Sequence, residues 1–135
     1  TLFPYTTLFR SDRKREAGVA GVLTQPVLTE QALENLKLAR KTLHGKILGG
    51  IIPVVSQRNA LFMNSEIAGI TVDQRIIEAY EGADRARGEE LAVEISARVA
   101  AAAAPYVDGF YLMTPFGRTG LMVRIMERIR QDGLA

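Results

Sequence analysis

Apolar positions along the chain form two kinds of pattern. Continuous apolar runs, which predict strands covered on both faces, lie at Val19–Thr24, Ile47–Val55 and Phe110–Met113. Between these runs, apolar residues recur with the helical period. Strands separated by helices indicate parallel strands joined by right-handed crossovers, and therefore an α/β fold.

Residues that favour helix ends bound the predicted helices. Gly18 and Gly45 are placed to end the first two helices. A charged connection over 82–88 precedes a strong helix at Glu89–Ala104, which Pro105 stops. The expected N-caps are Thr29, Ser56, Thr71 (in a capping box with Gln74) and Thr119. The expected buried positions of the last helix are Leu121, Met122, Ile125 and Ile129.

Length and composition narrow the fold and the partners. The 135 residues hold about three strand–helix units, too few for a complete (β/α)8 barrel of ~250 residues. The chain has no Cys and one His, which excludes disulfides, thiolate metal sites and multi-histidine metal sites. The net charge of +2 is too small to indicate a nucleic acid or a membrane surface, and no apolar run approaches the ~20 residues of a membrane span.

Polar side chains follow each predicted strand. Thr24 and Gln25 end the first strand, Ser56–Asn59 follow the second, and Thr114 and Arg118 follow the third. In a sheet of adjacent parallel strands, these groups would share the edge at which ligands bind. Amides and hydroxyls suit a pterin-like heterocycle, and Arg118 can hold a carboxylate bidentately. The plainer interpretation is that these residues only cap helices and form turns.

Other residues that could carry chemistry have simpler interpretations. No Ser/His/Asp constellation is visible, and no catalytic residue is assigned. His44 lies at a helix end and is expected to be an exposed cation, whereas Glu89 and Glu90 open a helix and interact with its dipole. Gly49 and Gly50 lie inside a strand without a phosphate-loop motif, which indicates close packing or a bulge. The methionines expected in the core are Met113, Met122 and Met126.

Residues 1–11 differ from the rest of the chain in composition and show no strand or helix period. Their sequence, TLFPYTTLFRS, matches the in-frame translation of a common sequencing-library adapter. We therefore interpret residues 1–11 as a non-native, disordered segment and residues 12–135 as a fragment of a larger domain. The alternative is a natural β-rich amino-terminal arm.

Three segments together resemble the carboxyl-terminal part of methylenetetrahydrofolate reductases. They are AGVAGVLTQP (Ala17–Pro26), GGIIPVVSQRNALFMN (Gly49–Asn64) and VDGFYLMTPFGRTGLMVRI (Val107–Ile125). The resemblance runs from Asp12 to about Arg130. The FYLMTPF segment is similar to the reductase half of bifunctional proteins that also carry a homocysteine S-methyltransferase domain. That domain would lie upstream, since its zinc-binding cysteines are absent here.

The resemblance implies that residues 12–135 are the incomplete carboxyl-terminal portion of a (β/α)8 TIM barrel, with about three parallel strands and their helices. It also implies a cytoplasmic flavoprotein of one-carbon metabolism. Such enzymes pass a hydride from NAD(P)H to FAD and then to 5,10-methylenetetrahydrofolate, which gives 5-methyltetrahydrofolate. A homo-oligomer is compatible with this family.

Three positions match the family's functional residues directly. The resemblance assigns Gln25 to the folate, Arg118 to the substrate site and Lys14 to the phosphate region of FAD. Without the resemblance, Lys14 would be part of a solvated helix face. The family's acidic residue that assists activation of the folate, like most of its flavin contacts, lies in strands upstream of this sequence.

Other positions depart from the simpler reductases. Asn59 replaces a substrate-contacting glutamine and keeps its hydrogen-bonding chemistry. Met63 replaces a stacking phenylalanine, and Met113 replaces a tyrosine, so apolar contact remains while aromatic stacking is lost. Gly117 replaces an asparagine. Asn59, Met63 and Met113 stay in the expected substrate site, with substrate affinity and nucleotide preference the properties most affected.

Two other functions fit the residues. One is a flavin-free folate or pterin barrel, such as a methyltetrahydrofolate methyltransferase. The other is a non-enzymatic α/β interaction module that is complete as it stands. If the reductase interpretation holds, residues 12–135 alone are expected to be inactive and to aggregate through unpaired strand edges.

Overall fold

The computed structural model describes residues 13–14, 16–114 and 117–134. The expectations for residues 1–11 lie outside the described residues. A helical turn at residues 13–14 and 16 leads to Gly18, whose φ of 103° ends it as expected. The elements that follow are β1 (Gly21–Pro26), α2 (Glu30–Thr42), β2 (Lys46–Ile51), α3 (Gln57–Glu66), α4 (Gln74–Ala79), α5 (Arg85–Ala103), the 3-10 turn η1 (Ala104–Tyr106), β3 (Gly109–Leu112) and α6 (Thr119–Gln131).

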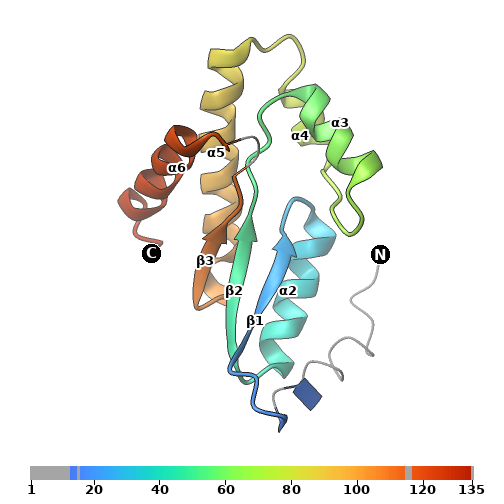
Figure 1. Ribbon diagram of the computed structural model, residues 1–135, viewed down its shortest axis with the longest axis vertical. Helices are drawn as coiled ribbons and strands as arrows, with labels where there is room; N and C mark the ends of the chain where they lie inside the picture. The colour runs from blue at the N-terminus through green and yellow to red at the C-terminus, as the bar shows by residue number, and fades with distance from the viewer. Residues whose placement is uncertain (1–12, 15, 115–116, 135) are drawn as a thin grey trace.

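The three strands form one parallel sheet in the order β1-β2-β3 (Figure 1). Leu48 in β2 pairs with Leu23 in β1 and with Gly109 in β3. The register shifts once, between Leu23 and Pro26, where β1 approaches its end. The predicted α/β class, with adjacent parallel strands separated by helices, is therefore confirmed. None of the helices over the described residues is both long and apolar enough to cross a bilayer.

Helices cover one face of this sheet, so the prediction that the strands are covered on both faces is wrong for β1, where Leu23 is exposed. Ile47 of β2 packs with residues of α2, and Ile51 packs with residues of α5 and α6. The buried helix residues in these two clusters are Leu36, Ala39, Ala92, Ala100, Ala103, Leu121, Met122, Ile125 and Ile129. Because side chains alternate along a strand, Leu23 of β1 faces the opposite side, where it is 63% exposed. The expected inward face of α6 is confirmed.

Gly49 and Gly50 allow close packing inside β2. A Cβ atom on Gly50 would lie 2.8 Å from the Tyr111 hydroxyl oxygen and 3.0 Å from the Thr24 carbonyl oxygen. A Cβ on Gly49 would meet the Val107 side chain at 3.2 Å. The Tyr111 ring thus crosses β2 over Gly50, and its hydroxyl donates a hydrogen bond to the Thr24 carbonyl of β1. The predicted packing role of the two glycines is confirmed.

Several helix starts differ from the prediction. Asp73, rather than Thr71, caps α4 by accepting a hydrogen bond from the Arg75 N–H. Helix α5 begins at Arg85 under an Asp84 cap, so most of the expected charged connection is helical. Thr119, which was expected to be a cap, is instead the first residue of α6. One helix end also differs, because α2 ends at Thr42, before Gly45. The carboxylates of Asp73 and Asp84 accept N–H bonds at least as well as threonine, which explains the shifted starts.

Asp108 ties the start of β2 to α2 and β3. Its carboxylate accepts hydrogen bonds from the Ile47 backbone N–H at 2.8 Å and from the Arg40 guanidinium at 3.0 Å. Lys46 contributes a longer ion pair at 3.5 Å. The Ile47 N–H, followed by Arg40 and Lys46, lowers the pKa of Asp108 below its ordinary value of 3.8.

These contacts of the Asp108 carboxylate make the stability of the chain depend on pH. Because the folded-state pKa of Asp108 is depressed, its contribution is present above the ordinary pKa and is lost as the pH falls through the folded value. We expect Asp108→Asn to be less stable than the wild type at about pH 7, with the difference narrowing as the pH falls below the ordinary pKa of Asp108. Urea unfolding over a series of pH values measures this. Asp132→Asn, which removes an exposed pair with Arg128, is the control; a pH-independent gap for Asp108→Asn would contradict the argument.

The outer strands β1 and β3 each pair on one side only among the described residues. Unpaired strand edges are sites of self-association, and the exposed Leu23 adds apolar area to β1. We expect the chain to self-associate as its concentration rises, and Leu23→Lys to reduce this. Sedimentation velocity over a concentration series measures both effects. A monomer at all concentrations would contradict this expectation and would favour the complete interaction module.

Candidate functional site

Gln25, Asn59 and Arg118 lie at the carboxyl-terminal ends of three adjacent parallel strands. Gln25 is the penultimate residue of β1, Asn59 lies in the first turn of α3 after β2, and Arg118 immediately precedes α6 after β3 (Figure 1). The predicted shared edge is therefore confirmed. No hydrogen bond or ion pair between described residues links these three side chains to one another.

Gln25 is exposed, and its amide lies beside the turn between α3 and α4. A Cβ atom on Gly69, which has a φ of 83°, would lie 3.9 Å from the Gln25 amide carbon and nitrogen. In contrast, the hydroxyl of the neighbouring Thr24 forms its hydrogen bonds within the sheet. Its hydroxyl accepts a hydrogen bond from the Gly50 N–H at 3.0 Å and donates to the Gln25 carbonyl at 2.8 Å. Of the two predicted residues on β1, Gln25 is the one free to meet a ligand.

The side-chain oxygen of Asn59 is hydrogen-bonded to the backbone of the segment that follows β2. Its Oδ1 accepts a hydrogen bond from the Val55 N–H at 3.1 Å, and its own N–H donates to the Ser56 Oγ at 3.0 Å. Ser56 is thus the N-cap of α3, as predicted. The Asn59 Nδ2 group, with no partner among the described residues, can donate to a ligand. Only the amide N–H groups of Asn59 are therefore open to the ligand contact that was predicted for it.

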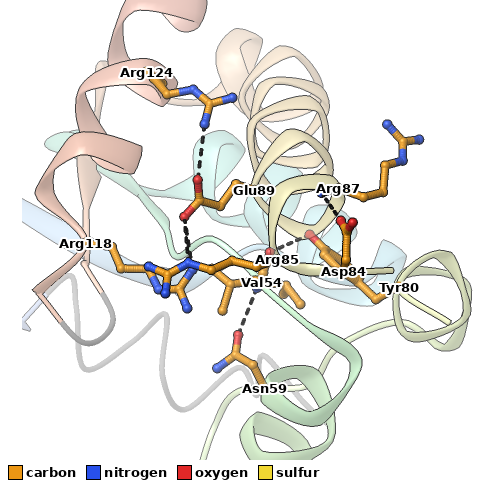
Figure 2. A network of polar contacts seen from close by, with 10 residues as sticks. Val54, Asn59, Tyr80, Asp84, Arg85, Arg87, Glu89, Arg118 and Arg124 are labelled. Carbon is orange, nitrogen blue, oxygen red and sulfur yellow. Dashed lines mark hydrogen bonds and ion pairs between the residues drawn. The ribbon is translucent and has the colours of Figure 1, made fainter. Parts of the chain in front are cut away.

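A buried tyrosine that was not among the predicted site residues fixes the same segment. Tyr80 is 2% exposed, and its hydroxyl donates a hydrogen bond to the Val54 carbonyl (Figure 2). Burial, followed by the nearby Glu94 charge, raises the pKa of Tyr80, so the phenol stays neutral and keeps its donor. Tyr80 therefore holds the exit of β2 in the position that places Asn59.

Arg118 belongs to a group of charges around Glu89. Its Nη1 lies 3.4 Å from Glu89 Oε1, while Arg124 Nη1 lies 3.5 Å from Glu89 Oε2 (Figure 2). Arg85, one turn before Glu89 on α5, approaches Oε1 at 3.7 Å. The sequence analysis placed Glu89 at a helix start, where it would meet only the dipole. Recognising Asp84 as the cap would have moved the start of α5 and turned Glu89 towards Arg118.

The methionines occupy different environments. Met63, expected at the substrate, is 1% exposed and lies in the core cluster that contains Val54 and Tyr80. Met113 is half-buried after β3, and its N–H donates to the Ile51 carbonyl at 2.9 Å. Met126 is 40% exposed on α6, so the prediction that it is a core residue is wrong. Met63 reaches a ligand only if the packing around α3 opens.

Lys14 lies apart from the other candidates. Its carbonyl accepts a hydrogen bond from the Val19 N–H at 3.1 Å, which places it by the amino-terminal start of β1 (Figure 1). Gln25 lies at the opposite end of that strand. The structure therefore does not bring Lys14 to the edge that carries Gln25, Asn59 and Arg118. His44 is exposed just after α2, as expected.

A groove of about 330 Å³ lies elsewhere, between α2, α4 and α5. Its apolar lining includes Leu28, Leu33, Ile76, Leu91, Ile95 and Val99. None of the predicted site residues lines it. The groove lies on the helical side of the sheet, so it adds nothing to the strand-end site.

The strand-end site can bind a polar ligand but carries no complete catalytic set. Gln25 offers a donor and an acceptor, Asn59 offers donors, and Arg118 offers a cation. No group of three or more acidic or histidine side chains among the described residues could hold a metal ion. In comparisons with known proteins, no family model and no curated protein matches the chain.

Proposed function

We propose that this chain is the carboxyl-terminal portion of a (β/α)8 barrel that reduces 5,10-methylenetetrahydrofolate to 5-methyltetrahydrofolate with NAD(P)H and FAD. The proposal rests on the positions of Gln25, Asn59 and Arg118, which lie at the carboxyl-terminal ends of three adjacent parallel strands. Barrel enzymes place their active sites at this edge. The resemblance of the same three segments to methylenetetrahydrofolate reductases supplies the reaction.

Each of the three residues has a defined part in binding. The Gln25 amide would pair with the pterin ring, and the Asn59 Nδ2 group would donate a second hydrogen bond to it. Arg118 would hold the carboxylate tail. Of the described residues, only Lys14 is assigned to FAD by the resemblance, and its place by the start of β1 does not fit a flavin at the strand ends. We therefore derive no step through the flavin from this chain.

Among the described residues, Leu23 is exposed on one face of the sheet and β1 and β3 each pair on one side only, which favours the barrel over a complete small domain. Further strands would pair with β1 and β3, and Leu23 would then face the barrel interior. An upstream homocysteine S-methyltransferase domain, a homo-oligomeric assembly and a cytoplasmic location belong to the same proposal.

The test is an NAD(P)H oxidation assay on the protein expressed from the whole reading frame that contains this sequence. We expect bound FAD, and a loss of roughly 10–100-fold in kcat/KM for methylenetetrahydrofolate in Gln25→Ala and Arg118→Ala. His44→Ala, at the other end of the sheet, is the control. A flavin-free protein that binds methyltetrahydrofolate would instead indicate the methyltransferase alternative, and one that binds no folate would indicate the interaction module.

A further inference from the structure

We propose that Arg85, Arg118 and Arg124 form a binding site for an anion that carries two or more negative charges. These residues come from the start of α5, the residue before α6 and the second turn of α6. Figure 2 shows their guanidinium groups gathered around the carboxylate of Glu89. Arg118 is also part of the proposed folate contact, whereas Arg85 and Arg124 have no part in it.

The charges around Glu89 do not balance. Three guanidinium groups share one carboxylate, and no other carboxylate of the described residues forms an ion pair with any of the three. The cluster therefore has a formal surplus of two positive charges. Like charges held this close repel one another, and a multivalent anion would relieve that repulsion.

The geometry of the ion pairs points the same way. A strong arginine–carboxylate pair is bidentate, with N–O distances of about 2.7–2.9 Å. Here the three distances are 3.4, 3.5 and 3.7 Å, and each arginine approaches through one nitrogen. Most of the donors on Arg85, Arg118 and Arg124 thus have no protein acceptor among the described residues, and oxygens of a phosphate or carboxylate ligand can accept from them.

Exposure leaves the cluster open to a ligand. The Arg85 and Arg124 side chains are 78% and 48% exposed, while Arg118 and Glu89 are 25% and 27% exposed. The site is therefore a shallow one with a half-buried base formed by Arg118. Because its charges are in contact with solvent, binding should weaken as salt is added.

Equilibrium dialysis of the 135-residue chain at low salt tests the proposal with two probes, inorganic pyrophosphate and tricarballylate, and does not require a monomeric sample. Saturable binding of either probe supports the site. Pyrophosphate alone indicates a phosphate ligand, and tricarballylate alone indicates a polycarboxylate. No saturable binding of either would overturn the proposal.

The variants separate this site from general attraction to a basic chain. We expect Arg85→Gln and Arg124→Gln each to weaken binding roughly tenfold. Arg87→Gln is the matched control because it removes the same charge from α5 at a side chain that pairs with Glu90 and Glu94 and points away from Glu89 (Figure 2). Equal losses in all three variants would overturn the proposal.

Glu89→Gln gives the sharpest outcome. If Glu89 occupies part of an anion site, its neutralisation removes a competitor, and binding should strengthen several-fold. If the arginines serve only to anchor Glu89, binding should not change, which would contradict the proposal. The anion-site proposal is argued from charge and geometry alone, so a negative reductase assay would not contradict it. A negative dialysis assay would not contradict the reductase proposal either.

Discussion

Gly88→Ala is expected to destabilise the chain strongly, although the same change usually stabilises a helix. Gly88 is a buried residue in the first turns of α5, where a Cβ atom would lie 2.4 Å from the Val55 carbonyl oxygen. Helix α5 would have to move away from the end of β2, and such overpacking costs about 3 kcal/mol in free energy of unfolding. In a domain of ordinary stability, about 5–15 kcal/mol, that loss removes about a fifth to three fifths of the free energy of unfolding, although the folded state still predominates.

The control is the same substitution in another helix. Gly120 lies near the start of α6, and a Cβ there would meet no atom within 4 Å. Gly120→Ala should therefore stabilise the chain by up to about 1 kcal/mol, the difference in helix propensity. Urea unfolding of the wild type and both variants measures the two effects. If Gly88→Ala proved neutral or stabilising, the close approach of α5 to β2 would be wrong.

Met63→Ala is expected to produce the second large loss. Met63 is 1% exposed and lies in the cluster that joins α3 to α4 and α5. Its truncation leaves a cavity and should cost about 2–5 kcal/mol. Met63→Leu keeps the volume and should cost less than about 1.5 kcal/mol.

The two Met63 variants also test whether Met63 belongs to the core or to the substrate site. A residue that only contacts substrate would tolerate alanine with little loss of stability, because its side chain would be exposed in the free protein. Thermal unfolding without any ligand therefore distinguishes the two roles. Equal stability of Met63→Ala and the wild type would contradict the core position and return Met63 to the substrate surface.

The parallel sheet was predictable because its signals are local. Continuous apolar runs mark strands covered by helices, and helical periodicity between them leaves parallel pairing as the simple topology. The strand-end positions of Gln25, Asn59 and Arg118 followed from that topology alone. The caps Thr29 and Ser56 were also predictable, because each hydroxyl accepts the N–H three residues later, from Ala32 and Asn59 respectively.

The errors arose where competing local signals had similar strength. The segment 71–74 offers both Thr71 and Asp73 as caps, and the Asp73 carboxylate is the one that caps α4. The segment 82–88 was predicted to be a charged connection, yet α5 includes residues 85–88, and Gly88 allows the close approach to Val55. Arg85 lies one turn before Glu89 on the same helix, so their pairing follows once α5 begins at Arg85, whereas Arg124 reaches Glu89 only through the packing of α6 on α5.

We propose above all that residues 12–135 belong to a larger barrel reductase. Sequencing of the source DNA across the junction before the codon for Asp12, with primers that carry no library adapter, tests this claim most directly. The account predicts an open reading frame that continues upstream into further strand–helix units with acidic residues at strand ends. If the natural DNA instead encodes Thr1–Ser11 directly after a start codon, the claim is contradicted, and the interaction-module alternative takes its place.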